Sequence, residues 1–481
     1  MDKNDIIRLH ITDITSDGEG IGKLDAFPFF VKDAIIGDEI EAVITKIKKT
    51  YGYARLLNII TPSSDRVAPL CPIARPCGGC QLQEMSYNAQ LKFKENLVRN
   101  NLIRLGGNPT YEMLPICGMD EPFYYRNKAQ FPVGLGKDGS IKIGFFAGRT
   151  HSIIENDICY IGHPINKKII DIVRSFMIDN NILPYDEETG TGCVRHILTR
   201  VGYKTGEIMV CLVINSKTLK NQDKLVKALL EIDNIKSIVL NLNTEKTNVI
   251  LSGDTKLVYG KPYIEDYIGD IKYQISANSF FQVNPIQTEK LYSKALEFAE
   301  LTGKENVWDL YCGIGTISLF LAKNAKKVYG VEIVPQAIDN AKANASLNNI
   351  DNVEFYVGKS EEVFPEYCKE HPDEYVDCIV VDPPRKGCDE KLLSTIVSMA
   401  PERIVYVSCD SATLARDVKY LTEYGYQLKK AQCFDQFCHT VHVETVALLI
   451  NQNASAKHHI EIGIDAEEYY RIKDSENDTD E

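Results

Sequence analysis

Apolar and polar positions in the C-terminal part of the chain follow an alternating pattern. From about Ile268 to Ile450, short apolar runs alternate with stretches of helical periodicity. The apolar runs are ENVWDLY, KKVYGVEI, NVEFYV, YVDCIVVD, RIVYVS and ETVALLI. Strands that alternate with helices favour a parallel sheet covered by helices on both faces. We therefore predict an α/β domain over residues 268–450, doubly wound and Rossmann-like.

The first 60 residues have a β-rich pattern. The runs IIRLHITDI, GIGKLDAFPFFVKDAI, DEIEAVITKIKK and YGYARLLNII are separated by SDGEG and GD turns. They predict a small OB-like barrel of five strands over residues 1–60, a fold that often binds nucleic acid through basic and aromatic side chains. Candidates for such a face are Lys46, Lys48, Lys49, Tyr51, Tyr53 and Arg55. A solvated basic hairpin is the alternative, and the pattern supports both equally.

The segment between these two parts has no single periodicity. TPSSDRVAP interrupts regular structure, and SYNAQLKFKENLVRNNLIRLGG predicts a helix that ends at paired glycines. We predict a mixed α+β central domain over residues 61–267. Residues 451–481 are polar and acidic, and we expect a disordered tail there.

Composition narrows the class of protein. The 481 residues have the make-up of a globular chain, without an apolar run of about 18 residues that would span a bilayer. The N-terminus lacks the apolar core of a signal peptide, so we expect a cytoplasmic protein. The 14 cysteines should then be reduced, which favours metal binding or catalysis over disulfides. We also expect a monomer.

Net charge does not identify a partner. The chain carries −13, but residues 461–481 hold nine acids and two bases and so contribute −7. Charge on a tail is screened within roughly 10 Å at moderate salt. Nucleic acid is therefore neither excluded nor favoured.

A glycine turn marks a candidate cofactor site. WDLYCGIGTISLFLA predicts a strand, a turn and a helix, which is the usual arrangement at the ligand crevice of open α/β sheets. The turn lacks the third glycine of the dinucleotide fingerprint, which disfavours a nicotinamide cofactor. Glu332 ends the next strand, where an acid can accept hydrogen bonds from ribose hydroxyls. The combination DLxCGxG…GVE favours S-adenosylmethionine, although Glu332 taken alone is more typical of a surface carboxylate at a strand end.

The strand DCIVVDPPRKG places Asp382 before two prolines, which hold the chain rigidly there. Enzymes that methylate amines often carry a related D/N-P-P-aromatic stretch. Here Arg385 replaces the aromatic residue, so we predict that Asp382 positions the cofactor or the base. A capping aspartate is the alternative.

RIVYVSCDSATL places Cys409 at the end of a strand and before a helix, whose N-terminal field would favour a thiolate. A buried apolar cysteine is the alternative. Beside a methyl donor, a thiolate can add to carbon 6 of uracil and make carbon 5 nucleophilic. Glu444 precedes the last apolar run, where a buried acid is costly unless it has a partner or a task, and it can serve as the base. His439 and His442 lie nearby and receive no role.

Three cysteines with the spacing C-x5-C-x2-C occur in CPIARPCGGC, and Cys159 is a plausible fourth. The three are Cys71, Cys77 and Cys80. A three-plus-one arrangement favours an iron–sulfur cluster, because most zinc sites combine two close pairs. Zinc and no metal remain open. The other nine cysteines are interpreted as small buried or surface thiols.

Several motifs occur together in one order along the chain: CPIARPCGGC, SFFQVNPIQTEKLY, DLYCGIGTISLFLA, VDPPRKG, VSCDSATLARD and HTVHVET. In this the sequence resembles the RNA uracil-5-methyltransferases of the bacterial 23S rRNA type. The resemblance implies that Cys409 is the nucleophile and Glu444 the proton-abstracting base. It implies cofactor contacts from Gln282, Tyr311, Glu332 and Asp382. It also implies that Phe280 stacks on the extruded uracil.

The same resemblance implies an N-terminal TRAM barrel and a [4Fe-4S] cluster held by Cys71, Cys77, Cys80 and Cys159. The cluster would staple the fold or contact RNA, because the chemistry needs no electron. We expect 23S rRNA as the substrate. The alternatives are a tRNA uracil-5-methyltransferase, since archaeal-type relatives share these features, a cytosine-5 RNA methyltransferase, and a non-catalytic iron–sulfur protein that binds RNA.

Overall fold

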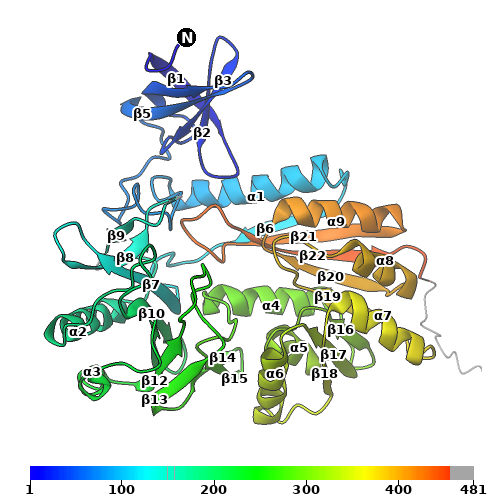
Figure 1. Ribbon diagram of the computed structural model, residues 1–481. Helices are drawn as coiled ribbons and strands as arrows, with labels where there is room; N and C mark the ends of the chain where they lie inside the picture. The colour runs from blue at the N-terminus through cyan, green and yellow to red at the C-terminus, as the bar shows by residue number, and fades with distance from the viewer. Residues whose placement is uncertain (149, 157, 455–481) are drawn as a thin grey trace, which may run out of the picture.

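The computed structural model describes residues 1–148, 150–156 and 158–454 (Figure 1). The predicted tail lies outside the described residues from 455 onward. None of the described helices is long and apolar enough to cross a membrane.

The N-terminal part is a closed barrel, as predicted from its β-rich pattern. Its strands are β1 (Ile6–Ile14), β2 (Gly20–Leu24), β3 (Phe27–Lys32), β4 (Glu39–Ile47) and β5 (Gly52–Thr61), in the order β1-β2-β3-β5-β4. Alternate residues of β1 point inward, so that Ile7, Leu9 and Ile11 are buried while their neighbours are exposed. Closure leaves the barrel without a free edge.

Buried ion pairs attach the barrel to the segment that follows it. Arg66 donates to the buried Asp38 of the barrel at 2.6 Å and also pairs with Glu84. Arg75 binds the same Glu84 at 2.5 Å. In addition, Lys32 Nζ donates to the carbonyl of Arg75 at 2.9 Å. The barrel is therefore held in one orientation.

The central part is built on a seven-stranded sheet with the order β13-β12-β11-β10-β7-β8-β9. Its strands are β7 (Lys128–Leu135), β8 (Ile141–Phe146), β9 (Ile153–Glu155), β10 (Val194–Val201), β11 (Ile208–Ile214), β12 (Ile235–Leu242) and β13 (Thr255–Gly260). Helices α2 (Ile165–Asp179) and α3 (Gln222–Leu229) pack their apolar residues on this sheet. The predicted mixed α+β character is confirmed.

The C-terminal part is an eight-stranded sheet with helices on both faces. Its strands are β16 (Asn306–Asp309), β17 (Lys327–Glu332), β18 (Val353–Val357), β19 (Cys378–Val381), β20 (Arg403–Ser408), β21 (Tyr426–Phe434), β22 (Glu444–Asn451) and β6 (Glu112–Cys117). Its helices are α4 (Pro285–Ala299), α5 (Thr316–Ala322), α6 (Pro335–Leu347), α7 (Ser360–Glu370), α8 (Glu390–Met399) and α9 (Ser411–Glu423). A hairpin, β14 (Tyr263–Ile268) and β15 (Ile271–Ser276), precedes it.

The strand order is β18-β17-β16-β19-β20-β22-β21-β6. The first five strands are parallel, as predicted, whereas β22 runs antiparallel to both β20 and β21. The difference arises because a hairpin loop, not a helix, joins β21 to β22. This reversal starts β22 at the sheet edge where β20 ends.

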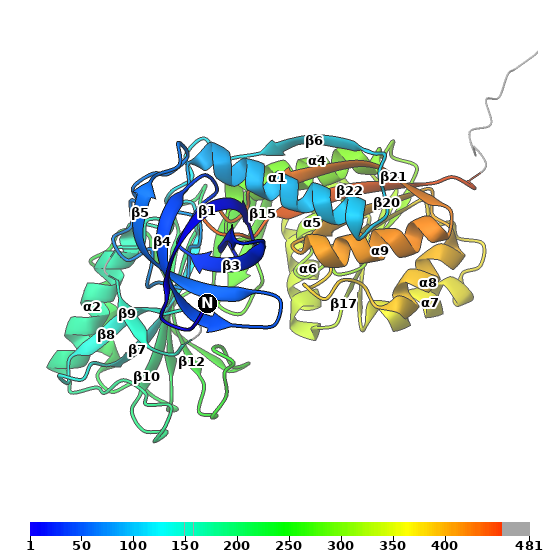
Figure 2. The same cartoon turned by 90° about the horizontal axis from the view of Figure 1, so that it is seen from above.

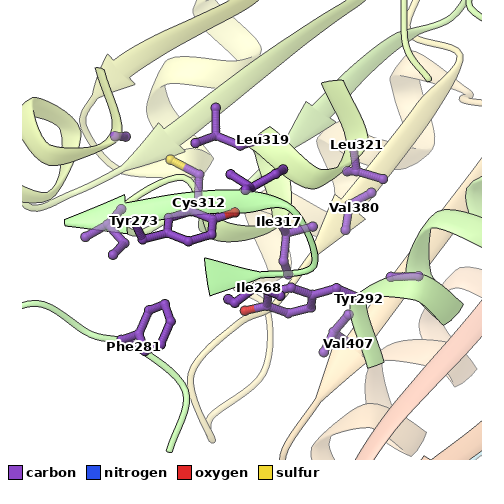
Figure 3. Packing of buried hydrophobic residues seen from close by; sticks show 14 of the residues in the cluster. Ile268, Tyr273, Phe281, Tyr292, Cys312, Ile317, Leu319, Leu321, Val380 and Val407 are labelled. Atoms are coloured by element: carbon purple, nitrogen blue, oxygen red, sulfur yellow. The ribbon is translucent and has the colours of Figure 1, made fainter. Parts of the chain in front are cut away.

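Each face of this sheet has its own apolar core. In β19, Cys378 and Val380 face one core, and Ile379 and Val381 face the other. Figure 3 shows the first core, in which Tyr292 of α4 lies near Val407 of β20. A strand that is buried on both faces is apolar throughout, which explains why the sequence shows continuous apolar runs here.

An upstream strand and helix complete the C-terminal part. Strand β6 pairs in parallel with β21 at the sheet edge, although it comes from the segment before β7. Helix α1 (Tyr87–Arg104), the helix predicted from the sequence, begins at Ser86 as its N-cap and runs beside α9 (Figures 1 and 2). Its Asn101 donates to Ser411 Oγ at 2.8 Å.

Candidate active site

Acidic and thiol side chains gather at one edge of the eight-stranded sheet. Strands β16, β17, β19 and β20 are parallel, so their carboxyl ends meet at this edge, where Asp309, Glu332, Asp382 and Cys409 lie. Strand β22 begins at the same edge, because Ser408 pairs with Thr445 in the antiparallel register. Glu444 therefore joins the group. The structure brings the predicted Glu332, Asp382, Cys409 and Glu444 together at one edge, with Asp309 beside them.

The carboxyl groups here are harder to ionise than usual. Burial, together with the charge of Asp382, raises the pKa of Glu444 to about 8. Burial and the neighbouring Asp309 raise the pKa of Asp382 to about 7. Burial also raises the pKa of Asp309 to about 6, although Ser318 donates a hydrogen bond to it at 2.6 Å. Adjacent acids with raised pKa values favour a cationic ligand, because a positive charge relieves their repulsion.

Cys409 is half-buried, and its thiol differs from the prediction. Burial, with the charges of Glu444 and Asp382, raises the pKa of Cys409 to about 12, against a lowering by Arg385. The expectation that the helix α9 would favour a thiolate is wrong for this state of the protein. The reason is the burial of the thiol together with the charges of Glu444 and Asp382. Asp410 caps the helix and accepts hydrogen bonds from the backbone N–H groups of Ala412 and Thr413.

Arg385 lies on the same rim, in the loop after the two prolines. Its charge lowers the pKa of both Glu444 and Cys409. Its guanidinium lies 3.4 Å from His442 Nε2, and Thr413 Oγ1 donates to its carbonyl at 3.1 Å. The residue that replaces the aromatic of the related motif thus faces the candidate nucleophile and base.

The glycine turn leaves room for a ligand. A Cβ added at Gly313 would meet no atom within 4 Å, whereas one at Gly315 would lie 3.2 Å from Ala341 and Phe355. Glu332 lies beside the turn and accepts from the backbone N–H groups of Gly313 at 3.3 Å and Val334 at 3.0 Å. The space next to Gly313 and the Glu332 carboxylate fit a nucleoside.

The remaining predicted cofactor residues lie in the segments around this rim. Tyr311 is half-buried and lies two residues after the end of β16. Gln282 is buried between β15 and α4, and its Oε1 accepts from Gln436 Nε2 at 3.4 Å. Two residues earlier, Phe280 is 70% exposed, in contrast to Phe281 at 3%. An exposed ring at this position is available for stacking.

Sequence reasoning missed two residues of the site. Asp309 ends β16 just before the glycine turn, and the acid in WDLYCG was the available signal. Gln436 donates to Thr288 Oγ1 at 2.9 Å and lies in the loop before Glu444. No local signal marks Gln436, because its partners are remote in the sequence.

The four predicted metal ligands form a separate site. Cys71, Cys77, Cys80 and Cys159 line one cavity of about 320 Å³, together with Arg126 and Lys128. Burial raises the pKa of Cys80 to about 12, with further contributions from the other three thiols. As the side chains stand, no group of three or more His, Cys, Asp or Glu in residues 1–148, 150–156 and 158–454 is placed to hold a metal ion. The structure brings the four together in one cavity, and the metal stays a prediction.

Aromatic side chains gather on the barrel. The ring centroids of Phe30 and Tyr51 are 5.2 Å apart, those of Phe30 and Tyr53 5.8 Å, and those of Tyr51 and Tyr53 5.6 Å. These three rings are called the barrel aromatic cluster below. Phe30 lies on β3, Tyr53 lies on β5 together with the predicted Arg55, and Tyr51 comes directly before β5.

Comparison with known proteins identifies the family to which the chain belongs. Residues 190–452 match the family described as tRNA (uracil-5-)-methyltransferase, and residues 3–57 match the TRAM domain. The chain belongs to the tRNA (uracil-5-)-methyltransferase family and carries an N-terminal TRAM domain. An uncharacterised RNA methyltransferase of Clostridium tetani is 50% identical over 448 residues, which cover 93% of this chain and 96% of the relative. Another from Halalkalibacterium halodurans is 50% identical, covering 94% of this chain and 98% of the relative.

A solved structure has the same overall arrangement. It is the tRNA (uracil-54, C5)-methyltransferase of Pyrococcus abyssi in complex with S-adenosyl-L-homocysteine. The two chains are 29% identical with a TM-score of 0.75, and the match covers 92% of this chain and 100% of the other. The resemblance to RNA uracil-5-methyltransferases is therefore confirmed at the level of family and fold.

Proposed function

We propose that this protein methylates carbon 5 of a uridine in RNA, with S-adenosylmethionine as the methyl donor. The observation that carries the proposal is the meeting of Cys409, Glu444 and Asp382 at the sheet edge beside the glycine turn. S-Adenosylmethionine supplies an electrophilic methyl group and a positive charge. We place it against Gln282, Tyr311, Glu332 and Asp382. The raised pKa values of the acids support a cationic ligand there.

Cys409 starts the reaction in this proposal. Its thiolate adds to carbon 6 of uracil, and the electrons of the 5,6 double bond move toward oxygen 4, which leaves carbon 5 nucleophilic. Carbon 5 would then take the methyl group as the bond between that group and the donor's sulfonium sulfur breaks, with S-adenosylhomocysteine as the leaving group. A free thiol with a pKa of about 12 is a poor nucleophile, but a bound cation beside Asp382 lowers the pKa of that thiol through its field.

Glu444 completes the reaction. Its carboxylate removes the proton from carbon 5, the electron pair restores the 5,6 double bond, and the Cys409 thiolate leaves. The target base must leave its stack to reach these groups, which costs a few kcal/mol. We assign Phe280 to stack on the extruded base, which offsets about 1–3 kcal/mol.

Two variants test this chemistry. Cys409→Ala should abolish methyl transfer, because no adduct can form. Glu444→Gln should still add and methylate but should remain bound to RNA as a covalent adduct, visible on a denaturing gel. Cys193→Ala is the matched control, because Cys193 is half-buried in the central part. Methyl transfer by Cys409→Ala at the wild-type rate would overturn the mechanism.

We propose 23S rRNA as the substrate on the basis of the motif resemblance. The whole-chain similarity to an archaeal tRNA enzyme favours tRNA as the second candidate. Total RNA from a strain that lacks this protein, mapped for 5-methyluridine, separates the two. Loss of the mark from 23S rRNA supports the first candidate, and loss only from tRNA supports the second.

We further propose that the four-cysteine cavity holds a [4Fe-4S] cluster. The support is the donor set, because four thiols line one cavity with Arg126 and Lys128, whose charges suit an anionic group. When bound, the cluster joins the loop of Cys71 to the loop of Cys159 and takes no part in methyl transfer. Iron and sulfide analysis of anaerobically purified protein tests it: about four of each are expected, and Cys80→Ser should lose both. Stoichiometric zinc, or no metal, would overturn it.

A further inference from the structure

The loop between β21 and β22 delivers Glu444 to the active site. In the hairpin register Phe434 pairs with Glu444, so Asp435 is the first residue of the loop and lies next to the candidate base. Among the described residues, Glu444 Oε2 has no hydrogen-bond partner. Because no hydrogen bond holds this oxygen, we infer that the position of the Glu444 carboxylate depends on the backbone where β21 and β22 meet the loop.

A buried ion pair with α1, a helix far upstream in the sequence, holds the mouth of this hairpin. Lys94 of α1 donates to Asp435, and both side chains have 0% exposure. The same ammonium donates to the carbonyl of Phe437 at 3.0 Å. Tyr87 of α1 donates to the second carboxylate oxygen of Asp435 at 2.8 Å. Lys94 and Tyr87 of α1 thus bind both carboxylate oxygens of Asp435, and Lys94 also binds the loop backbone at Phe437.

His439, later in the same loop, is held by α1 and by residues just before that helix. Gln90 Nε2 of α1 donates to His439 Nδ1 at 3.2 Å, and Gln90 Oε1 accepts from the His439 backbone N–H at 3.2 Å. The backbone N–H groups of Gln81 and Leu82 both donate to the His439 carbonyl at 3.0 Å. His439 itself has φ +66° and stacks on Phe123 at 4.3 Å. A non-glycine residue keeps such a backbone only when its surroundings impose it.

We propose that Lys94, acting through Asp435, is a positioning residue for Glu444. The proposal rests on the proposed function, because it assigns Lys94 to the step that Glu444 performs. That step is removal of the carbon 5 proton and expulsion of Cys409. Formation of the adduct and transfer of the methyl group depend on Cys409 and the cofactor, and Lys94 is not assigned to either.

The test separates methyl transfer from product release. Lys94→Met keeps the aliphatic length of the side chain and removes its charge. In single turnovers at saturating RNA, we expect methyl transfer within about threefold of wild type. We expect release of methylated RNA to slow at least tenfold, so the covalent adduct accumulates during steady-state turnover. Asp435→Asn should show the same defect, and it carries the test if Lys94→Met does not fold, because it keeps the shape and the hydrogen bond from Tyr87.

Two controls exclude a merely structural role. Arg66→Met removes another ion pair with a buried acid, away from the hairpin, and should leave the ratio of methyl transfer to release unchanged. When Glu444→Gln is already present, adding Lys94→Met should not slow release of methylated RNA any further, because Lys94 is proposed to act on release only through Glu444. Equal slowing of both steps, an unchanged release rate, or additive slowing in the double variant would overturn the proposal. Absence of an adduct even with Glu444→Gln would instead overturn the proposed function.

Discussion

Glu444 is the residue whose protonation state decides the last chemical step. Its pKa of about 8 arises from burial and from Asp382, so at neutral pH most of the free protein carries a neutral carboxylic acid at this position. A general base must be ionised to act. The same environment that makes Glu444 a strong base therefore limits the fraction of molecules in which it can work.

Release of product from a preformed adduct should consequently depend on pH. We expect its rate to rise about tenfold for each pH unit below the pKa and to level off above about pH 8, since only the carboxylate accepts the proton. Rapid mixing of the wild-type adduct, formed in a single turnover, into buffers between pH 5.5 and 9 measures this. A flat profile over that range would argue against Glu444 as the base.

The raised pKa also predicts a cost in stability. A group that holds its proton in the folded state up to about pH 8, but releases it near 4.5 when unfolded, lowers the free energy of unfolding as the pH rises between these values. Glu444→Gln removes this ionisation. We expect it to stabilise the protein by about 1–2 kcal/mol at pH 8 and by less at pH 5. Thermal melting at both pH values tests this, and equal effects at the two would contradict it.

At the scale of elements, the two glycines of the turn between β16 and α5 have different roles. Gly315 is packed against its neighbours, and Gly313 borders the proposed ligand space. Gly315 has φ +81° and close neighbours, whereas Gly313 has φ +56° and open space. Both conformations are unfavourable for alanine, but only one has a crowded Cβ.

The two alanine variants should therefore differ. Gly315→Ala should destabilise the protein by about 1–3 kcal/mol, because strain adds to overpacking. Gly313→Ala should cost about 1 kcal/mol of stability and weaken binding of S-adenosylmethionine at least tenfold, since the methyl group enters the ligand space. Melting curves and calorimetric titration measure the two effects. Wild-type affinity in Gly313→Ala would show that the ligand lies elsewhere.

The elements also show how far the sequence could predict the site. Continuous apolar runs identified the parallel strands, and the residues at their ends, Asp382 and Cys409, meet as expected because parallel strands share one edge. The pKa of Cys409 was not predictable, because it depends on burial and on carboxylates that other strands bring beside it. The roles of β6 and Lys94 were not predictable either, since each depends on a partner more than 300 residues away.

At the scale of the whole molecule, ion pairs attach the barrel to the segment after it, so the barrel aromatic cluster has a defined place relative to that segment. We propose that this cluster contacts RNA. We expect Tyr51→Ala to weaken binding of a long RNA about tenfold, since loss of base stacking costs about 1–3 kcal/mol. The single-turnover rate at saturating RNA should not change. Tyr259→Ala is the control, because Tyr259 is exposed on β13, far from the barrel (Figure 1). Equal loss of affinity in both variants would remove the barrel from RNA recognition.

The upstream strand β6 has a consequence for how this protein is made. Gln432 of β21 and Pro115 of β6 are hydrogen-bonded across 317 residues of chain. A ribosome that adds about 5–20 residues per second needs on the order of 16–60 s to bridge that interval. During this time the nascent chain exposes β6 without its neighbour, as well as the face of α1 that later covers α9. Unpaired strands and bare apolar faces are what holdase chaperones bind, so biogenesis of this enzyme should depend on such protection more than that of a methyltransferase whose sheet is contiguous in sequence.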